Sequence, residues 1–202
     1  MKNIFFAGSE LSVNAGSTDA LHIAEKQNQK NTLNVNHYHP IQKLLHWMSA
    51  LVILWATITG FSVAFGIFSE EYAKAIGNFN VSLTLLFVPF FVARIIFAIY
   101  FGKPVDQRFT KNQRTLINTM HFIIYVVISI VLISGVLMME RDIVFGSYFI
   151  FKPIIEQGDV TQAFLEIHRY SCIVLALLLF IHISAVFHHQ VKGVNIIKKM
   201  SF

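Results

Sequence analysis

Residues 162–189 of this chain read QAFLEIHRYSCIVLALLLFIHISAVFHH. This stretch is long and apolar enough to cross a lipid bilayer as one α-helix, since a span needs about 20 predominantly apolar residues. It nevertheless contains two histidines, His168 and His182. The fourteen residues between them rise about 21 Å in an α-helix and turn about 40° short of four full turns. Both rings therefore lie on nearly one face, one toward each side of the membrane.

Histidines at these depths need an explanation, because ionisable side chains are costly inside a bilayer and usually have a function there. Neutral imidazole is a good ligand for iron. Two histidines placed in this way can each serve one haem, one in each half of the membrane. The alternative is that they cap the helix or form hydrogen bonds between helices.

The composition supports a membrane protein. The chain has 202 residues, of which 55% are hydrophobic and 20 are Phe, and its mean hydropathy is +0.60. Soluble domains have a lower apolar content. The single cysteine, Cys172, excludes an internal disulfide. The net charge is +5, but no basic cluster is interleaved with aromatic residues, so we do not predict nucleic-acid binding.

Three further apolar segments of spanning length precede this one, at residues 40–67, 76–101 and 115–139. Pro40 suits a first helical position, and Pro89 should kink its helix or loosen one hydrogen bond. We therefore predict an all-α integral membrane four-helix bundle over residues 37–202. Residues 1–36 are polar and mixed, and we interpret them as a cytoplasmic extension.

The loop charges predict the orientation, because cytoplasmic loops are enriched in Lys and Arg. The loop between spans two and three is basic, with Lys103, Arg108, Lys111 and Arg114 against Asp106. The loop between spans three and four is acidic, with Glu140, Asp142, Glu156, Asp159 and Glu166 against Arg141 and Lys152. The C-terminal tail is basic again. We expect both termini to lie in the cytoplasm.

This topology places His46 and His182 at equal depth near the cytoplasmic side. A haem iron between two opposed imidazoles needs one ligand from each of two facing helices at the same depth. His46 and His182 meet that condition. His168 lies near the outer side, where spans one, two and three contain no histidine to oppose it. His121 begins span three at the cytoplasmic side and is too distant from His168.

Several segments together resemble the prokaryotic cytochrome b561 family, which is related to the cytochrome b subunits of formate dehydrogenase and nickel–iron hydrogenase. Span one contains YHPIQKLLHW at residues 38–47. Span three reads HFIIYVVISIVLISGVLMM at residues 121–139. Span four and its tail read HRYSCIVLALLLFIHISAVFHHQVKGVNIIKKM at residues 168–200. The resemblance implies a four-helix membrane protein with haem in the bundle core.

The resemblance also implies the haem ligands. In the family, the span-one histidine and the second histidine of span four hold one haem, which carries over to His46 and His182. The first histidine of span four, here His168, holds the other haem with a histidine of outer span two. Arg94 matches an arginine usual late in that span, and counting back fourteen residues through NVSLTLLFVPFFVAR gives Asn80. This chain therefore departs from the family at one of its four ligands.

Three outcomes are open at the outer site, because an asparagine amide is a poor iron ligand beside imidazole. The outer haem is absent and His168 forms a hydrogen bond with Asn80. Alternatively, an outer haem stays five-coordinate on His168. In the third outcome Met138 or Met139 supplies the missing ligand, since a thioether can bind haem iron.

Two polar residues of the inner half have open roles. Arg94 is expected to pair with a haem propionate, because guanidinium binds carboxylates well, and the alternative is that its side chain extends to the lipid headgroups. For His121, contact with quinone, contact with a propionate and a role in capping the helix are all open.

The resemblance implies electron transfer through haem b between a quinone pool, such as ubiquinone, and a partner or small redox molecule. The alternative is an accessory haem-binding subunit that braces a larger respiratory complex, with residues 1–36 as a strap on that partner. In both cases the protein contacts lipid and is a multi-pass protein of the bacterial inner membrane.

Overall fold

A computed structural model of the chain describes residues 21–26, 38–102, 109–140, 142–145, 149–155, 158–193, 197 and 200. Most of the N-terminal extension and several of the charged loop residues lie outside this part. The chain divides into two compact units. Residues 21–26 form a short exposed helix in the first unit. The second unit contains the four long helices, which are described from here on.

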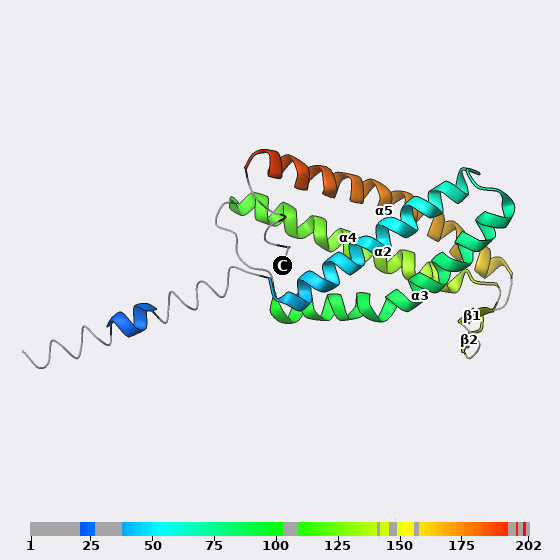
Figure 1. The fold of residues 1–202 in the computed structure, drawn as a ribbon, viewed down its shortest axis with the longest axis horizontal. Helices are drawn as coiled ribbons and strands as arrows, with labels where there is room; N and C mark the ends of the chain where they lie inside the picture. The colour runs from blue at the N-terminus through cyan, green and yellow to red at the C-terminus, as the bar shows by residue number, and fades with distance from the viewer. Residues whose placement is uncertain are drawn as a thin grey trace, which may run out of the picture. The chain divides into compact units, whose positions relative to one another are not determined.

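The four predicted spans are present as helices. They are α2 (Pro40–Ala64), α3 (Glu70–Phe101), α4 (Lys111–Leu137) and α5 (Asp159–Val191) (Figure 1). The shortest has 25 residues and therefore measures about 38 Å at 1.5 Å per residue, enough to cross a bilayer. All four have the length and apolar composition of membrane spans. The predicted all-α four-helix membrane fold is confirmed.

Local sequence signals define the helix ends. His39 caps α2, where its side chain accepts from the backbone N–H of Ile41 and Pro40 follows as the first residue. Gly66 and Gly102 follow α2 and α3 with φ of 68° and 65°, a left-handed conformation that favours glycine. Helix α3 begins six residues earlier than predicted and continues through Pro89.

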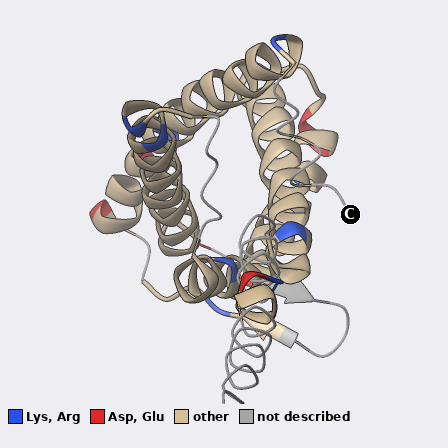
Figure 2. Ribbon diagram, turned by 90° about the vertical axis from the view of Figure 1, so that its left-hand side faces the viewer, with Lys and Arg blue, Asp and Glu red and all other residues tan. Residues whose placement is uncertain are grey.

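The helices pack mainly in two pairs, α2 with α3 and α4 with α5, and α3 also contacts α4 (Figure 1). A small apolar core joins the pairs and takes residues from all four helices: Ile53, Phe87, Phe91, Ile124, Ile128 and Leu175. Viewed along the helices, the ribbons of the four helices consist almost wholly of uncharged residues, with charged residues mainly near their ends (Figure 2). Large apolar side chains on that surface are more than 60% exposed: Leu51, Ile58, Ile99, Leu177 and Phe180. Such a surface suits contact with lipid.

A short hairpin follows α4 and was not predicted from the sequence. Strands β1 (Ile143–Phe145) and β2 (Phe149–Phe151) pair antiparallel, with Val144 opposite Ile150. Strand β1 contacts α3. The three-residue strands are too short to produce a clear alternating pattern in the sequence.

Candidate functional site

One end of the bundle contains a polar side chain from each helix. These are His46 of α2, Arg94 of α3, His121 of α4 and His182 of α5, and all four are partly buried. The first residues of α2 lie beside the last residues of α3, because Gln42 donates to the carbonyls of Phe97 and Gly102. We call these four residues the inner cluster.

Direct contacts hold the inner cluster together. A guanidinium nitrogen of Arg94, Nη2, lies 2.9 Å from Nδ1 of His46. The same guanidinium lies over the ring of Tyr125, 5.2 Å from its centroid. The rings of His121 and His182 meet edge to face with their centroids 5.3 Å apart.

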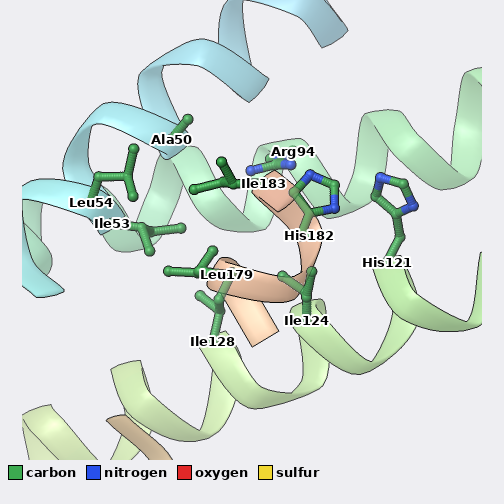
Figure 3. Close-up of a pocket in the computed structure, with 10 residues that line it drawn as sticks. All are labelled: Ala50, Ile53, Leu54, Arg94, His121, Ile124, Ile128, Leu179, His182 and Ile183. Atoms are coloured by element: carbon green, nitrogen blue, oxygen red, sulfur yellow. The ribbon is translucent and has the colours of Figure 1, made fainter. Parts of the chain in front are cut away.

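A pocket opens beside the inner cluster, between all four helices (Figure 3). Its empty space is about 520 Å³, with the open solvent at its mouth included. Arg94, His121 and His182 supply its polar groups, and the other walls are aliphatic: Ala50, Ile53, Leu54, Ile124, Ile128, Leu179 and Ile183. The lining therefore suits an apolar ligand that carries a few polar groups.

This set of side chains fits a haem. The porphyrin ring is apolar, its iron takes imidazole ligands, and its two propionates are carboxylates that a guanidinium can pair with. The inner cluster offers two imidazoles from α2 and α5 and one arginine from α3, beside aliphatic walls. His46, His182 and Arg94, which were predicted from the sequence, lie at this same end of the bundle.

The contact between Arg94 and His46 determines which ring nitrogen of the neutral His46 carries the hydrogen. Arginine can only donate, so Nδ1 of His46 must accept, and in a neutral ring the hydrogen is then on Nε2. If Nε2 is to bind iron, its hydrogen has to move to Nδ1, and Arg94 has to give up this bond. A nearby carboxylate is then its natural partner.

At the other end of the bundle, His168 lies against α4. Its Nδ1 is 3.1 Å from the carbonyl oxygen of Val131 and 3.3 Å from Oγ of Ser134. Its Nε2 is 3.5 Å from Sγ of Cys172, one turn along α5. A methyl group on Gly135 would meet the ring at 3.2 Å, so this glycine makes room for the histidine.

Asn80 does not lie against His168. Its Nδ2 donates to Oγ1 of Thr59 at 2.9 Å, and its Oδ1 lies 3.2 Å from the same oxygen. The amide is therefore bonded to α2, while His168 is bonded to α4. The hydrogen bond between His168 and Asn80, which was part of one predicted outcome, is corrected by these contacts: each side chain finds a closer partner on its neighbouring helix. Met139 is buried and Met138 is the C-cap of α4.

The sequence analysis missed Tyr125, Thr59, Ser134 and Gly135 as neighbours of the predicted site residues. A hydroxyl or a glycine inside an apolar helix is common, because Ser and Thr can bond to the carbonyl four residues earlier. Ser134 and Thr59 do so as well, with Ile130 and Trp55. Their sequence positions alone therefore gave no signal of the contacts between helices.

A comparison with known families identifies the bundle. The family model described as prokaryotic cytochrome b561 matches residues 37–202. The chain belongs to the prokaryotic cytochrome b561 family. It is thus a membrane b-type cytochrome that takes part in electron transfer and binds haem b, and it is a multi-pass protein of the inner membrane. No curated protein sequence matches the chain. For this cytochrome, the family resemblance found in the sequence is confirmed.

Proposed function

We propose that this cytochrome transfers electrons between a quinone pool and a partner through one haem b held by His46 and His182. The observation that carries the proposal is the inner cluster, in which four helices bring His46, Arg94, His121 and His182 together beside an apolar pocket that the last three of them line. Bound haem supplies one-electron chemistry at its iron. The ligands, the hydrogen bonds to them and their burial set its potential.

Each group of the pocket has its own task in this proposal. His46 and His182 bind the iron from α2 and α5. Arg94 pairs with a propionate and so stabilises the carboxylate in an apolar surrounding. The aliphatic walls, among them Ile53 and Leu179, exclude water and keep the local dielectric constant low.

We propose further that the outer end is not an ordinary bis-histidine haem site. His168 faces α4 there, and Asn80 occupies the position at which the family resemblance implies the opposing ligand. A haem at His168 would have an open sixth position or a weaker ligand such as a methionine. A second state of the site, without haem, is equally compatible with the contacts of His168.

An accessory role in a larger respiratory complex is the second candidate function. The observation that favours it is the asparagine at position 80, where the family resemblance implies a haem ligand. A protein that lacks one of the four ligands is less suited to carry electrons across the whole membrane through two haems. Such a role would agree with the family's relation to the cytochrome b subunits of formate dehydrogenase and hydrogenase. Reduction of the purified cytochrome by a quinol analogue, followed in the visible spectrum, separates the two functions: an electron carrier is reduced rapidly and reversibly.

The first test removes the proposed iron ligands. His46→Ala and His182→Ala should each abolish the low-spin b-type spectrum of the inner haem, because one imidazole alone leaves the iron with an open position. The matched control is His188→Ala, which removes an exposed histidine of α5. Haem per polypeptide is measured by pyridine haemochrome on each purified variant. A normal bis-histidine spectrum in both ligand variants would overturn the assignment.

The second test concerns the outer end. Carbon monoxide should bind any outer haem that has an open position, whereas the six-coordinate inner haem resists it. Asn80→His should create a second low-spin haem opposite His168. Because Thr59 holds the present side chain toward α2, the double variant with Thr59→Val should do so more completely. Two bis-imidazole haems per unmodified chain, seen by electron paramagnetic resonance, would contradict this proposal.

A further inference from the structure

The ring of His168 rests on three residues of the neighbouring helix α4. Its Nδ1 lies 3.1 Å from the carbonyl oxygen of Val131 and 3.3 Å from Oγ of Ser134. A methyl group on Gly135 would lie 3.4 Å from the same nitrogen and 3.2 Å from Cε1, so the ring approaches bare backbone at this position. We call Val131, Ser134 and Gly135 the α4 seat.

These contacts determine which nitrogen of the neutral His168 ring carries the hydrogen. A carbonyl oxygen only accepts, so Nδ1 donates to the carbonyl of Val131. The hydroxyl of Ser134 donates to the carbonyl of Ile130 at 2.6 Å, so its lone pairs can face the same Nδ1 hydrogen. Nε2 of the neutral ring therefore has the lone pair that binds metals.

The described contact of Nε2 is a weak one. Sγ of Cys172 lies 3.5 Å away, one turn along α5, and a thiol is a weak donor. An iron atom that takes the lone pair of Nε2 displaces only this contact. His46 differs, because its Nδ1 accepts from Arg94 and its hydrogen has to move before Nε2 can bind iron.

We propose that the α4 seat positions His168 as an iron ligand that binds through Nε2. The inference rests on the proposed assignment of His168 to the outer haem site. A histidine that binds a metal almost always donates its other ring hydrogen to a carboxylate, a backbone carbonyl or water, which fixes its tautomer and orientation and raises its basicity. The carbonyl of Val131 is such a partner. The seat holds the ring in the same way with or without haem.

The composition of the seat supports more than packing. Glycine lowers the stability of a helix relative to alanine, and here it opens the backbone beside Val131 to a ring from α5. Ser134 is only 1% exposed, so its hydroxyl meets the Nδ1 hydrogen away from solvent. A donor left without a partner in such surroundings is costly, which opposes a turn of the ring. The seat therefore fixes both the direction and the tautomer of His168.

The first test measures the tautomer in the full chain. With 15N-labelled histidine rings, nitrogen magnetic resonance distinguishes a ring nitrogen that carries a hydrogen from one with a lone pair, and His168→Gln identifies the signals of this ring. We expect the hydrogen on Nδ1 in the unmodified protein. Gly135→Val should push the ring from the seat and produce a mixture of tautomers. Gly60→Val is the matched control, because a methyl group at Gly60 meets nothing within 4 Å.

The second test follows the iron. In the Asn80→His protein, adding Gly135→Val should weaken binding of the second haem about 10-fold or more, whereas adding Gly60→Val should leave it unchanged. If the unmodified chain holds an outer haem, the iron–imidazole stretching vibration of its ferrous form replaces the nitrogen signals. That frequency should fall in Gly135→Val, because Nδ1 then loses its hydrogen bond. Gly135→Ala takes the place of Gly135→Val if the larger side chain prevents folding.

A hydrogen on Nε2 of His168 in the unmodified protein would overturn the inference. An unchanged tautomer or vibration in the Gly135 variant would do the same. Equal effects of Gly135→Val and Gly60→Val would also overturn it, because the loss would then come from helix stability alone. Failure of the proposed outer site is a separate result: Asn80→His then gains no second haem, while the nitrogen signals still show whether the α4 seat fixes the ring.

Discussion

The contact between Gly135 and His168 shows how a single residue without a side chain can make room for an imidazole on the neighbouring helix. The ring of His168 lies against α4 because nothing projects from Gly135, and hydrogen bonds to Val131 and Ser134 hold it there. Glycine inside a helix is otherwise unfavourable by about 0.5–1 kcal/mol relative to alanine. Gly135 therefore lowers the stability of α4 slightly but allows the imidazole of His168 to approach the helix closely.

Gly135→Ala should not stabilise the protein, in contrast to Gly60→Ala. At Gly60 a methyl group meets nothing within 4 Å, so the full preference of the helix for alanine, about 0.5–1 kcal/mol, should appear as stability. At Gly135 the methyl group meets Cε1 of His168 at 3.2 Å, and the bonded ring cannot yield freely. Thermal unfolding in detergent measures both variants. Equal stabilisation would mean that His168 is not held against α4.

At the scale of the elements, Gln42 connects α2 to α3. It is the third residue of α2 and closes a capping box with His39. Its Nε2 also donates to the carbonyl of Phe97, near the end of α3, and to the carbonyl of Gly102, the residue that follows that helix. One side chain thus completes the hydrogen bonding of two helix ends and fixes their relative depth near His46.

Gln42→Ala should cost about 1–3 kcal/mol more unfolding free energy than Gln113→Ala, given about 0.5–1.5 kcal/mol for each of the two hydrogen bonds lost. Gln113 occupies the same position in the capping box of α4, and among the described residues its side chain bonds only to Thr110. Both variants lose the capping hydrogen bond, so the difference between their unfolding free energies reports the two bonds from Gln42 to α3. Unfolding of each variant in detergent, followed by circular dichroism, gives the difference. Equal losses would show that the bonds between the helices contribute nothing.

Sequence periodicity and length were sufficient to predict the four helices, because a lipid-exposed span has to be a continuous apolar run. The depth of each residue along its span also placed His46, Arg94, His121 and His182 at one end of the bundle. The side-chain partners were not predictable. Whether Asn80 turns toward α2 or α5, and whether His168 meets a glycine, depends on how the helices are rotated about their axes. An apolar sequence on every face does not determine that rotation.

For the molecule as a whole, the exposed apolar side chains and the charges at the two ends of the bundle indicate how the protein lies in the membrane. The helices expose large apolar side chains along their length, so only the ends can lie in water. Within the described residues, Lys111 and Arg114 lie at the end that carries His46. Glu140, Asp142 and Asp159 lie at the opposite end. Because cytoplasmic ends are basic, we expect the inner cluster near the cytoplasm and the hairpin outside.

Two cysteine substitutions in a Cys172→Ala background, which removes the single native cysteine, test this orientation in intact cells. Ser69 is exposed between α2 and α3 at the outer end, and its side chain forms no capping bond, so Ser69→Cys should leave the helices undisturbed. A membrane-impermeant thiol reagent should label it from outside. Lys111→Cys, exposed at the first residue of α4, should react only after the cells are opened. If Lys111→Cys reacted in intact cells and Ser69→Cys only after the cells were opened, the protein would have the opposite orientation. The haem site proposed for His46 and His182 would then lie near the outer surface and exchange electrons with a partner outside the cytoplasm.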